Sequence, residues 1–379
     1  MTTHSRRMFV KFAGTGAAML SLGTALSKTQ VSNAQTQSPL PTPSSLPTAA
    51  ASAQPAIPDP QMQAVLNELM ELKAPPLTEM TPANARQTSP LTIAVQTVLT
   101  KQNKTPLELV ANIKHLQIPG GARQPMLVRI YYPAGPGPFP ALVYFHGGGF
   151  VIANLDVYDA SCRALTNAAN CAVISVAYRL APEFKFPAAP NDAFAAYQWV
   201  LQNAASINVD SAKVAVGGES AGGNLATVTA LMARDRGVQA PVHQMLIYPL
   251  VTSIITPPVP AYPSYAEFVA AMPLATPVLP WFARHYFRRP ADGNSPYASP
   301  LRTNVAGLPP ATVITAQIDP LRDEGEAYAA KLRDAGVAVV AQRFDGVTHE
   351  FFGMGAVVDK AKQAVALAAG ELKKAFGTA

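Results

Sequence analysis

A serine stands between two glycines at residues 218–222, GESAG. A short run that contains two valines, residues 213–217, precedes this segment, and an apolar, alanine-rich stretch, residues 224–232, follows it. A Gly-x-Ser-x-Gly segment between a strand and a helix is typical of a nucleophile elbow, in which a tight turn leaves no room for side chains beside the serine. We therefore expect the Ser220 hydroxyl to project from the carboxyl edge of a sheet. Five residues alone also fit a glycine-rich turn with no chemical role.

A second glycine cluster, HGGGF at residues 146–150, follows an apolar run that begins at Ala141. Three glycines after a buried strand indicate that the backbone itself approaches something closely. In acyl-transfer chemistry that group is the oxyanion of the tetrahedral intermediate, and each backbone donor stabilises it by about 3–4 kcal/mol. The sequence predicts an oxyanion hole made by the N–H groups of Gly147, Gly148 and Ala221. His146 is expected to be structural, because its neighbours offer backbone rather than side chains.

A serine nucleophile of this kind is followed in the chain by an acid and then by a histidine. Residues 311–318 predict a strand, and Asp319 is the first residue after it. Asp323 lies a turn into the next predicted helix, and Asp345 stands close to His349, where it suits an Asp-Gly turn. Placement, together with the resemblance given below, favours Asp319. An aspartate before a proline also serves as a helix cap.

His349 is the only histidine after the last predicted strand, residues 337–344. In the predicted mechanism, neutral His349 takes the proton of Ser220 as the hydroxyl attacks an ester carbonyl, and Asp319 orients the imidazole. His349 then protonates the leaving alcohol, and water repeats the cycle on the acyl-enzyme. We expect no metal and no organic cofactor. The remaining histidines stand too early in the chain or in a predicted insertion: His4, His115, His146, His243 and His285.

The elements that must position these residues alternate between strand and helix. This alternation predicts an α/β fold with a mostly parallel sheet and helices on both faces. The predicted helices span residues 156–168 and 190–203, and the predicted strands, apart from those named above, span 108–118, 126–132, 172–178 and 243–248. Upstream, helices are expected after Asp59 and after Ser89, with apolar residues on one face. They precede the sheet, and we expect them to form part of a lid over the active site.

Five segments, in this order, resemble the hormone-sensitive-lipase-type α/β-hydrolases, the bacterial family IV carboxylesterases. The resemblance covers residues 108–379 and implies carboxylic ester hydrolysis. It also implies a helical cap built from the N-terminal helices and from an insertion, which residues 252–295 fit. Within them, the sequence predicts a helix near 265–272. Chain length, this insertion and the absence of a propeller-sized domain favour short-to-medium acyl esters over peptides. Ala177 and Glu219 depart from the commoner family residues, which leaves the role of Glu219 open. The segments are HGGGF at 146–150, YRLAPE at 178–183, GESAGG at 218–223, DPLRDEG at 319–325 and THEFF at 348–352.

The N-terminus resembles a twin-arginine export signal, because Arg6 and Arg7 are followed by an apolar stretch. This stretch is too short to form a stable membrane-spanning helix. An ordinary secretory signal or an uncleaved segment is the alternative. The expected localisation is periplasmic or secreted. The predicted organisation is a signal peptide at 1–34, a linker rich in Pro, Ser, Thr and Ala at 35–58, cap helices at 59–106, and a catalytic domain at 107–379 that carries the insertion.

Composition narrows the remaining function classes. The chain has 379 residues, 49% of them hydrophobic, and a formal charge of +6. Residues 1–34 hold four Lys or Arg and no acidic residue, and no basic stripe suggests a nucleic-acid partner.

Cys162 and Cys171 are expected to be buried free thiols, although a disulfide after export stays open. The expected partner is a small-molecule ester, with no membrane span in the mature chain and a homodimer left open. The alternatives are an interfacial lipase, an amidase, or a non-catalytic receptor on the same fold, which His349 argues against.

Overall fold

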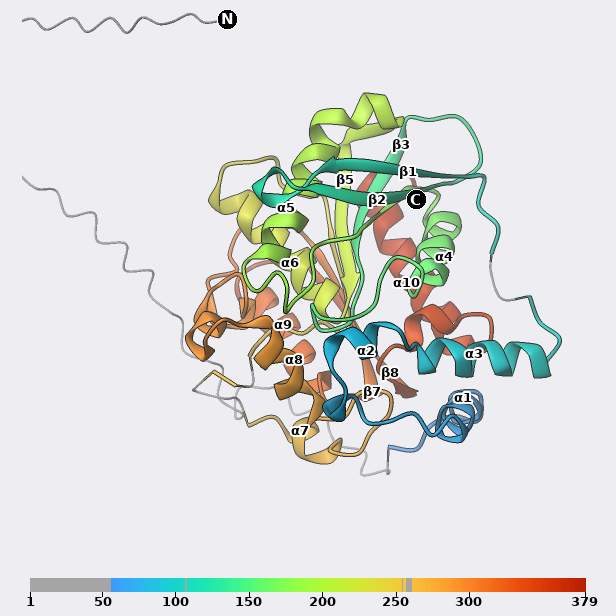
Figure 1. The fold of residues 1–379 in the computed structure, drawn as a ribbon. Coiled ribbons are helices and arrows are strands. Elements are labelled where there is room, and N and C mark those ends of the chain that lie inside the picture. Colours follow the sequence, from blue (N-terminus) through green and yellow to red (C-terminus); the bar gives the residue numbers. More distant parts are fainter. Residues whose placement is uncertain (1–55, 106–107, 254, 257–260) are drawn as a thin grey trace, which may run out of the picture. The chain divides into compact units, whose positions relative to one another are not determined.

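The computed structural model describes residues 56–379, except residues 106–107, 254 and 257–260. The expected signal peptide and nearly all of the expected linker lie outside the described residues. The described chain is organised around one eight-stranded sheet with the order β1-β2-β4-β3-β5-β6-β7-β8 (Figure 1). The strands are β1 (Asn112–Pro119), β2 (Pro125–Tyr132), β3 (Phe139–Phe145), β4 (Ala172–Val176), β5 (Val209–Glu219), β6 (Gln244–Ile247), β7 (Ala311–Ile318) and β8 (Val339–Thr348).

The central strands are parallel and buried on both faces. Strand β2 pairs antiparallel with β1 and with β4, and every pairing from β4 to β8 is parallel. All residues of β4 and β6 are buried, whereas the edge strands β1 and β8 keep many exposed positions. Continuous apolar sequence is what a strand covered on both sides requires. The predicted α/β fold with a mostly parallel sheet is confirmed.

Five helices cover the two faces of the sheet. Helices α5 (Ala188–Asn203), α6 (Ala221–Asp235) and α9 (Arg322–Asp334) pack into one hydrophobic core. Helices α4 (Asp159–Ala169) and α10 (Asp359–Phe376) pack into the other core, on the opposite face (Figure 1). Cys162 and Cys171 are buried and are not joined, as the sequence led us to expect. The apolar environment raises the pKa of both thiols.

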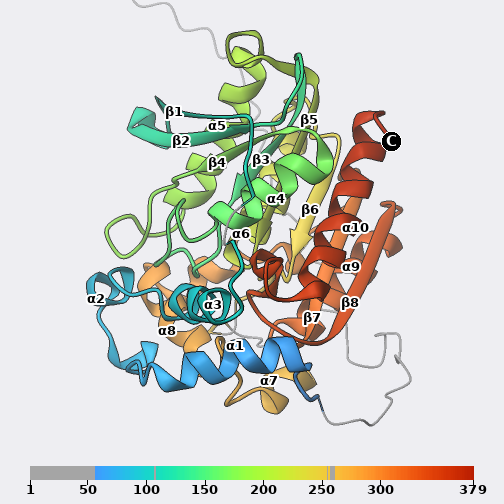
Figure 2. The ribbon, with the colours of Figure 1, turned by 90° about the vertical axis from the view of Figure 1, so that its right-hand side faces the viewer.

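The remaining α-helices of the described residues gather at one end of the sheet, and we call them the cap (Figure 2). They are α1 (Pro60–Glu71), α2 (Pro82–Arg86), α3 (Pro90–Lys101), α7 (Pro263–Glu267) and α8 (Val278–Tyr286). The helix predicted after Asp59 is present, and the Asp59 carboxylate caps it by accepting a bond from the Met62 N–H at 2.8 Å. The helix predicted after Ser89 is also present, with Pro90 in its first turn.

The insertion differs from its prediction in one element. A helix was expected near residues 265–272, but α7 runs from Pro263 to Glu267. Pro263 suits the first turn of a helix, so the helix begins earlier. The chain then reverses, and the Thr276 N–H donates to the Phe268 carbonyl at 3.2 Å. The residues that flank the insertion on its two sides are held by Asn224 of α6, whose Nδ2 donates to the carbonyls of Leu250 (2.8 Å) and Ala298 (3.1 Å).

Candidate active site

Ser220 is the single residue between β5 and α6. Its backbone has φ 56° and ψ −117°, in a region that residues with a side chain rarely occupy. Hydrogen bonds hold this conformation, because the Ser220 N–H donates to the Ile247 carbonyl at 2.9 Å and the Ser220 carbonyl accepts from the Leu250 N–H at 3.2 Å. Strained backbone of this kind persists only where its surroundings enforce it, and it is frequent at functional sites.

The two glycines of the GESAG segment are required by close contacts with β3. A Cβ atom on Gly218 would lie 2.3 Å from the Phe145 carbonyl oxygen, and one on Gly222 would lie 1.9 Å from the same oxygen. Real Cβ atoms do not approach backbone this closely. The glycines therefore let the turn sit directly against the end of β3, as the elbow interpretation requires.

Asp319 and His349 come together at the ends of the last two strands. Asp319 follows β7 and His349 follows β8, and His349 Nδ1 lies 2.7 Å from Asp319 Oδ2. The other oxygen of Asp319 accepts from the Leu321 N–H at 2.8 Å, and both side chains are buried. Burial by itself lowers the pKa of His349, but Asp319, Glu350 and Glu219 outweigh it and the net direction is upward.

The two rival acids lie elsewhere. Asp323 accepts hydrogen bonds from the Ser264 N–H at 2.8 Å and from Arg322 Nε at 2.7 Å, so it connects α9 to the cap. Asp345 is exposed and accepts from Arg343 Nε at 2.9 Å. Of the three aspartates considered from the sequence, Asp319 is the one that contacts His349.

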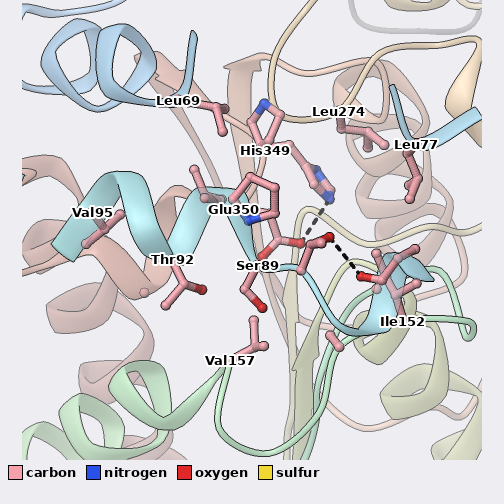
Figure 3. Close-up of a pocket in the computed structure, with 18 of the residues that line it drawn as sticks. Leu69, Leu77, Ser89, Thr92, Val95, Ile152, Val157, Leu274, His349 and Glu350 are labelled. Atoms are coloured by element: carbon pink, nitrogen blue, oxygen red, sulfur yellow. Dashed lines mark hydrogen bonds and ion pairs between the residues drawn. The ribbon is translucent and has the colours of Figure 1, made fainter. Parts of the chain in front are cut away.

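Ser220 and His349 line one cavity of about 730 Å³. Its walls come from the catalytic body and from the cap, and Figure 3 shows apolar side chains from both around His349. A second cavity, of about 50 Å³, reaches Ser220 from the side of α8 and is lined mainly by apolar residues. The labelled apolar residues of the larger cavity are Leu69, Leu77, Val95, Ile152, Val157 and Leu274.

The glycine loop after β3 passes close to the elbow. A Cβ atom on Gly147 would lie 3.1 Å from the Glu219 carbonyl oxygen, and Gly148 and Gly149 line the same cavity as Ser220. Gly148 has φ 93°, which favours glycine. Ala221 is the first residue of α6, so its N–H is at a helix N-terminus. His146 is buried and stacks on the Tyr178 ring at 4.4 Å.

Glu219, whose role the sequence left open, is buried between two tyrosines. Its carboxyl group accepts hydrogen bonds from the hydroxyls of Tyr144 and Tyr248. The Tyr248 ring in turn lies 4.6 Å from the His349 ring, measured between centroids. Burial is the largest cause that raises the pKa of Glu219, and the charge of Glu350 adds to it. Glu219 therefore supports the side chain on which His349 packs.

Sequence reasoning missed Glu350. Its Oε1 lies 3.7 Å from His349 Nε2, and its two oxygens accept from the Tyr158 hydroxyl at 2.7 and 2.8 Å. Burial is the largest cause that raises the pKa of Glu350, whereas His349 and Tyr158 lower it. Its position directly after His349 in the sequence could have indicated a place near the site. Its contact with Tyr158 could not be predicted, because Tyr158 is far away in the chain.

The fold and the site place this chain among known proteins. A family model described as the alpha/beta hydrolase fold matches residues 142–353. This chain belongs to that family. Together with esterase relatives such as an ethyl acetate hydrolase and a carboxylesterase, this match confirms the resemblance to hormone-sensitive-lipase-type carboxylesterases of the α/β-hydrolase superfamily.

Relatives and solved structures agree with this assignment. An ethyl acetate hydrolase from Pseudomonas putida is 39% identical over 63% of this chain and 76% of its own length. Esterase LipI from Mycobacterium tuberculosis is 38% identical over 72% of this chain and 84% of its own. A hyperthermophilic esterase from Pyrobaculum calidifontis is 39% identical, covers 85% of this chain and 100% of its own, and superposes with a TM-score of 0.76. Carboxylic ester hydrolysis is the activity that these relatives support for this enzyme.

The sequence predicted no membrane span in the mature chain. Within the described residues, no helix is both long enough and apolar enough to cross a bilayer.

Proposed function

We propose that this enzyme hydrolyses short-to-medium acyl esters through a triad of Ser220, His349 and Asp319. The observation that carries the proposal is the 2.7 Å contact between His349 Nδ1 and Asp319 Oδ2, beside a strained serine that lines the same cavity. A buried carboxylate on Nδ1 fixes the tautomer whose Nε2 is free to accept a proton. That arrangement gives the serine the base it needs at neutral pH.

The reaction proceeds in two halves. In the first, Ser220 Oγ attacks the ester carbonyl while His349 Nε2 takes its proton, and the imidazolium then protonates the leaving alcohol as the C–O bond breaks. In the second, water gives a proton to His349 Nε2 as it attacks the acyl-enzyme carbonyl. The bond from the acyl carbon to Ser220 Oγ then breaks, the imidazolium returns the proton to Oγ, and the carboxylic acid leaves. Asp319 stays ionised and stabilises the imidazolium in both halves.

The oxyanion of both tetrahedral intermediates is assigned to the N–H groups of Gly147, Gly148 and Ala221. Support comes from the approach of Gly147 to the elbow and from the place of Ala221 at the start of α6. Peptide N–H groups at a helix N-terminus carry partial positive charge, which stabilises an anion that forms there. The donors are fixed before the reaction begins, so little reorganisation is needed when charge develops.

The cavities support a substrate with an apolar chain. A cavity of about 730 Å³ lies within the range that accommodates a drug-sized molecule. Its cap-side wall includes Leu69 and Val95, so the cap is assigned a role in acyl-chain selection. An interfacial lipase is the second candidate, because the same apolar wall suits longer chains.

The experiment is a chain-length series of p-nitrophenyl esters, from acetate to palmitate, with the wild-type enzyme and with Ser220→Ala. We expect turnover that is highest for the short and medium esters and that falls by several orders of magnitude in the variant. Turnover that rises only above the solubility limit of the long esters would favour the lipase. Equal turnover by Ser220→Ala and the wild type would refute the proposed nucleophile.

Export is a separate proposal, and it rests on the sequence. We infer from Arg6, Arg7 and the apolar stretch after them that the protein leaves the cytoplasm by the twin-arginine route. Paired Arg6→Lys and Arg7→Lys substitutions should keep the protein in the cytoplasmic fraction. Unchanged export of that variant would contradict the twin-arginine assignment.

A further inference from the structure

Glu350 brings a second carboxyl group to His349, at the ring nitrogen away from Asp319. Glu350 Oε1 lies 3.7 Å from His349 Nε2, whereas Asp319 Oδ2 lies 2.7 Å from Nδ1. Figure 3 shows the contact between Glu350 and His349 at the cavity wall. In the mechanism proposed above, Nε2 is the atom that receives and returns the proton.

The protein holds this carboxyl group in place. The Tyr158 hydroxyl donates to both oxygens of Glu350, and Tyr158 is itself buried beside the glycine loop. The Glu350 side chain is 21% exposed and lines the cavity. Its backbone has φ 68°, a conformation that glycine adopts without strain. Neither the backbone conformation nor burial in the core therefore requires a long acidic side chain at this position.

We propose that Glu350 is a positioning residue that acts through His349: its carboxylate stabilises the imidazolium at the Nε2 edge and so sets the lower pH limit of ester hydrolysis. The inference rests on the proposed triad and goes beyond it. Glu350 is not assigned a contact with substrate. Its effect is electrostatic, because opposite charges separated by about 4 Å inside a protein interact more strongly than they do in water.

Other ionisable groups also surround His349, and they come from several elements. Asp319 follows β7, Glu219 ends β5, Tyr248 follows β6 and Tyr158 precedes α4. The carboxyl groups favour the charged imidazole, and burial opposes them. The charged residues that line the cavity farther out are Lys73, Arg86, Asp156 and Asp159. Arg86 forms an ion pair with Glu183 at 2.7 Å. Arg129 forms ion pairs with Asp156 at 2.6 Å and with Asp159 at 3.3 Å.

The sign of the pH effect follows from the mechanism. His349 must be neutral to accept the Ser220 proton, so every group that favours its charged form moves the acid limb of the activity profile to higher pH. An opposite charge within about 4–6 Å shifts a pKa by roughly one unit or more. Removing the Glu350 charge should therefore move the acid limb of kcat/KM to lower pH by about one unit. The alkaline plateau should fall several-fold, because a less basic His349 is a weaker proton acceptor.

The test compares Glu350→Gln and Glu350→Gly with the wild type, with Glu326→Gln as control. Glutamine keeps the shape of the side chain and an oxygen that accepts from Tyr158, whereas glycine also relieves the left-handed backbone. Glu326 is on α9, lies 3.6 Å from Arg343 and undergoes the same change of charge away from the cavity. The assay is kcat/KM for p-nitrophenyl butyrate across the acid limb, read at a wavelength where the product signal does not depend on pH. Thermal melting by circular dichroism checks that each variant is folded.

Acid limbs displaced to lower pH in both Glu350 variants, with the Glu326→Gln limb unchanged, would support the inference. A folded Glu350→Gln enzyme whose acid limb coincides with that of the wild type would overturn it, even if its activity were lower at every pH. That result would leave the proposed triad intact. The absence of Ser220-dependent hydrolysis in the wild type would instead defeat the proposed function, so the two failures can be told apart.

Discussion

Replacing Asp319 by asparagine tests the triad most directly, and its expected effect follows from the contacts of Asp319. One carboxylate oxygen accepts from the Leu321 N–H at 2.8 Å, and the other faces His349 Nδ1 at 2.7 Å. In Asp319→Asn, the amide oxygen must keep the bond to the Leu321 N–H, because an amide nitrogen cannot accept it. The NH₂ group of the asparagine then faces Nδ1.

This orientation forces His349 into the wrong tautomer. An NH₂ group donates to Nδ1 only if Nδ1 carries no proton, so the proton resides on Nε2, where the Ser220 proton has to go. The analogous change in a serine protease lowers kcat by about 10⁴. We expect a similar loss here, which corresponds to about 5.4 kcal/mol of transition-state stabilisation. Folding should be nearly unaffected, since the Leu321 hydrogen bond is retained.

The assay is kcat/KM for p-nitrophenyl butyrate at the pH optimum, together with a thermal melt. Asp323→Asn and Asp345→Asn are matched controls, because both aspartates lie outside contact with His349. Asp345 is exposed, and its substitution should change neither activity nor stability appreciably. Asp319→Asn that retains more than a tenth of wild-type activity would refute the tautomer argument. Loss of activity confined to Asp323→Asn or Asp345→Asn would show that the acid was assigned to the wrong residue.

Two further predictions concern the elbow and the cap. Gly222→Ala should destabilise the fold by about 1–3 kcal/mol or more and lower activity, because its Cβ would lie 1.9 Å from the Phe145 carbonyl oxygen. A melting temperature equal to that of the wild type would contradict this contact. Gly370→Ala is the control, because a Cβ atom at that position would have open space around it. Val95→Trp should narrow the larger cavity and reduce kcat/KM for the octanoate more than for the acetate ester. Ile93→Trp, at a position of α3 that is half exposed, should leave that ratio unchanged, and equal ratios in both variants would remove the cap from chain selection.

The elements could be predicted from the sequence because their signals are local. The apolar runs of β3 and β7 identify buried strands, and Asp59 before Pro60 marks a helix start. The elbow was predictable for the same reason, since strand, GESAG and helix are consecutive. The bounds of α7 were not, because its end depends on the bond from the Thr276 N–H to the Phe268 carbonyl within an irregular segment.

The site was only partly predictable, because its members meet across the sheet. The order of serine, acid and histidine, with the family resemblance, was enough to choose Asp319 over Asp345. The contacts that hold Glu350 beside His349 could not be predicted, because Tyr158, which donates to Glu350, is 192 residues away in the chain. Glu219 could be noticed as unusual, but its position between Tyr144 and Tyr248 depends on three neighbouring strand ends.

Asn224 holds the two chain segments that flank the insertion at one point, because its side-chain amide donates to the carbonyls of both Leu250 and Ala298. A segment that leaves and returns at one point can change in length or sequence without stretching the sheet beneath it. Asn224 stands one turn after Ser220, and its N–H donates to the Ser220 carbonyl at 3.1 Å. Residues 251–297 could therefore be exchanged between related chains. The exchange would alter the surface that faces the substrate, whereas the two hydrogen bonds from Asn224 to the flanking carbonyls would be retained.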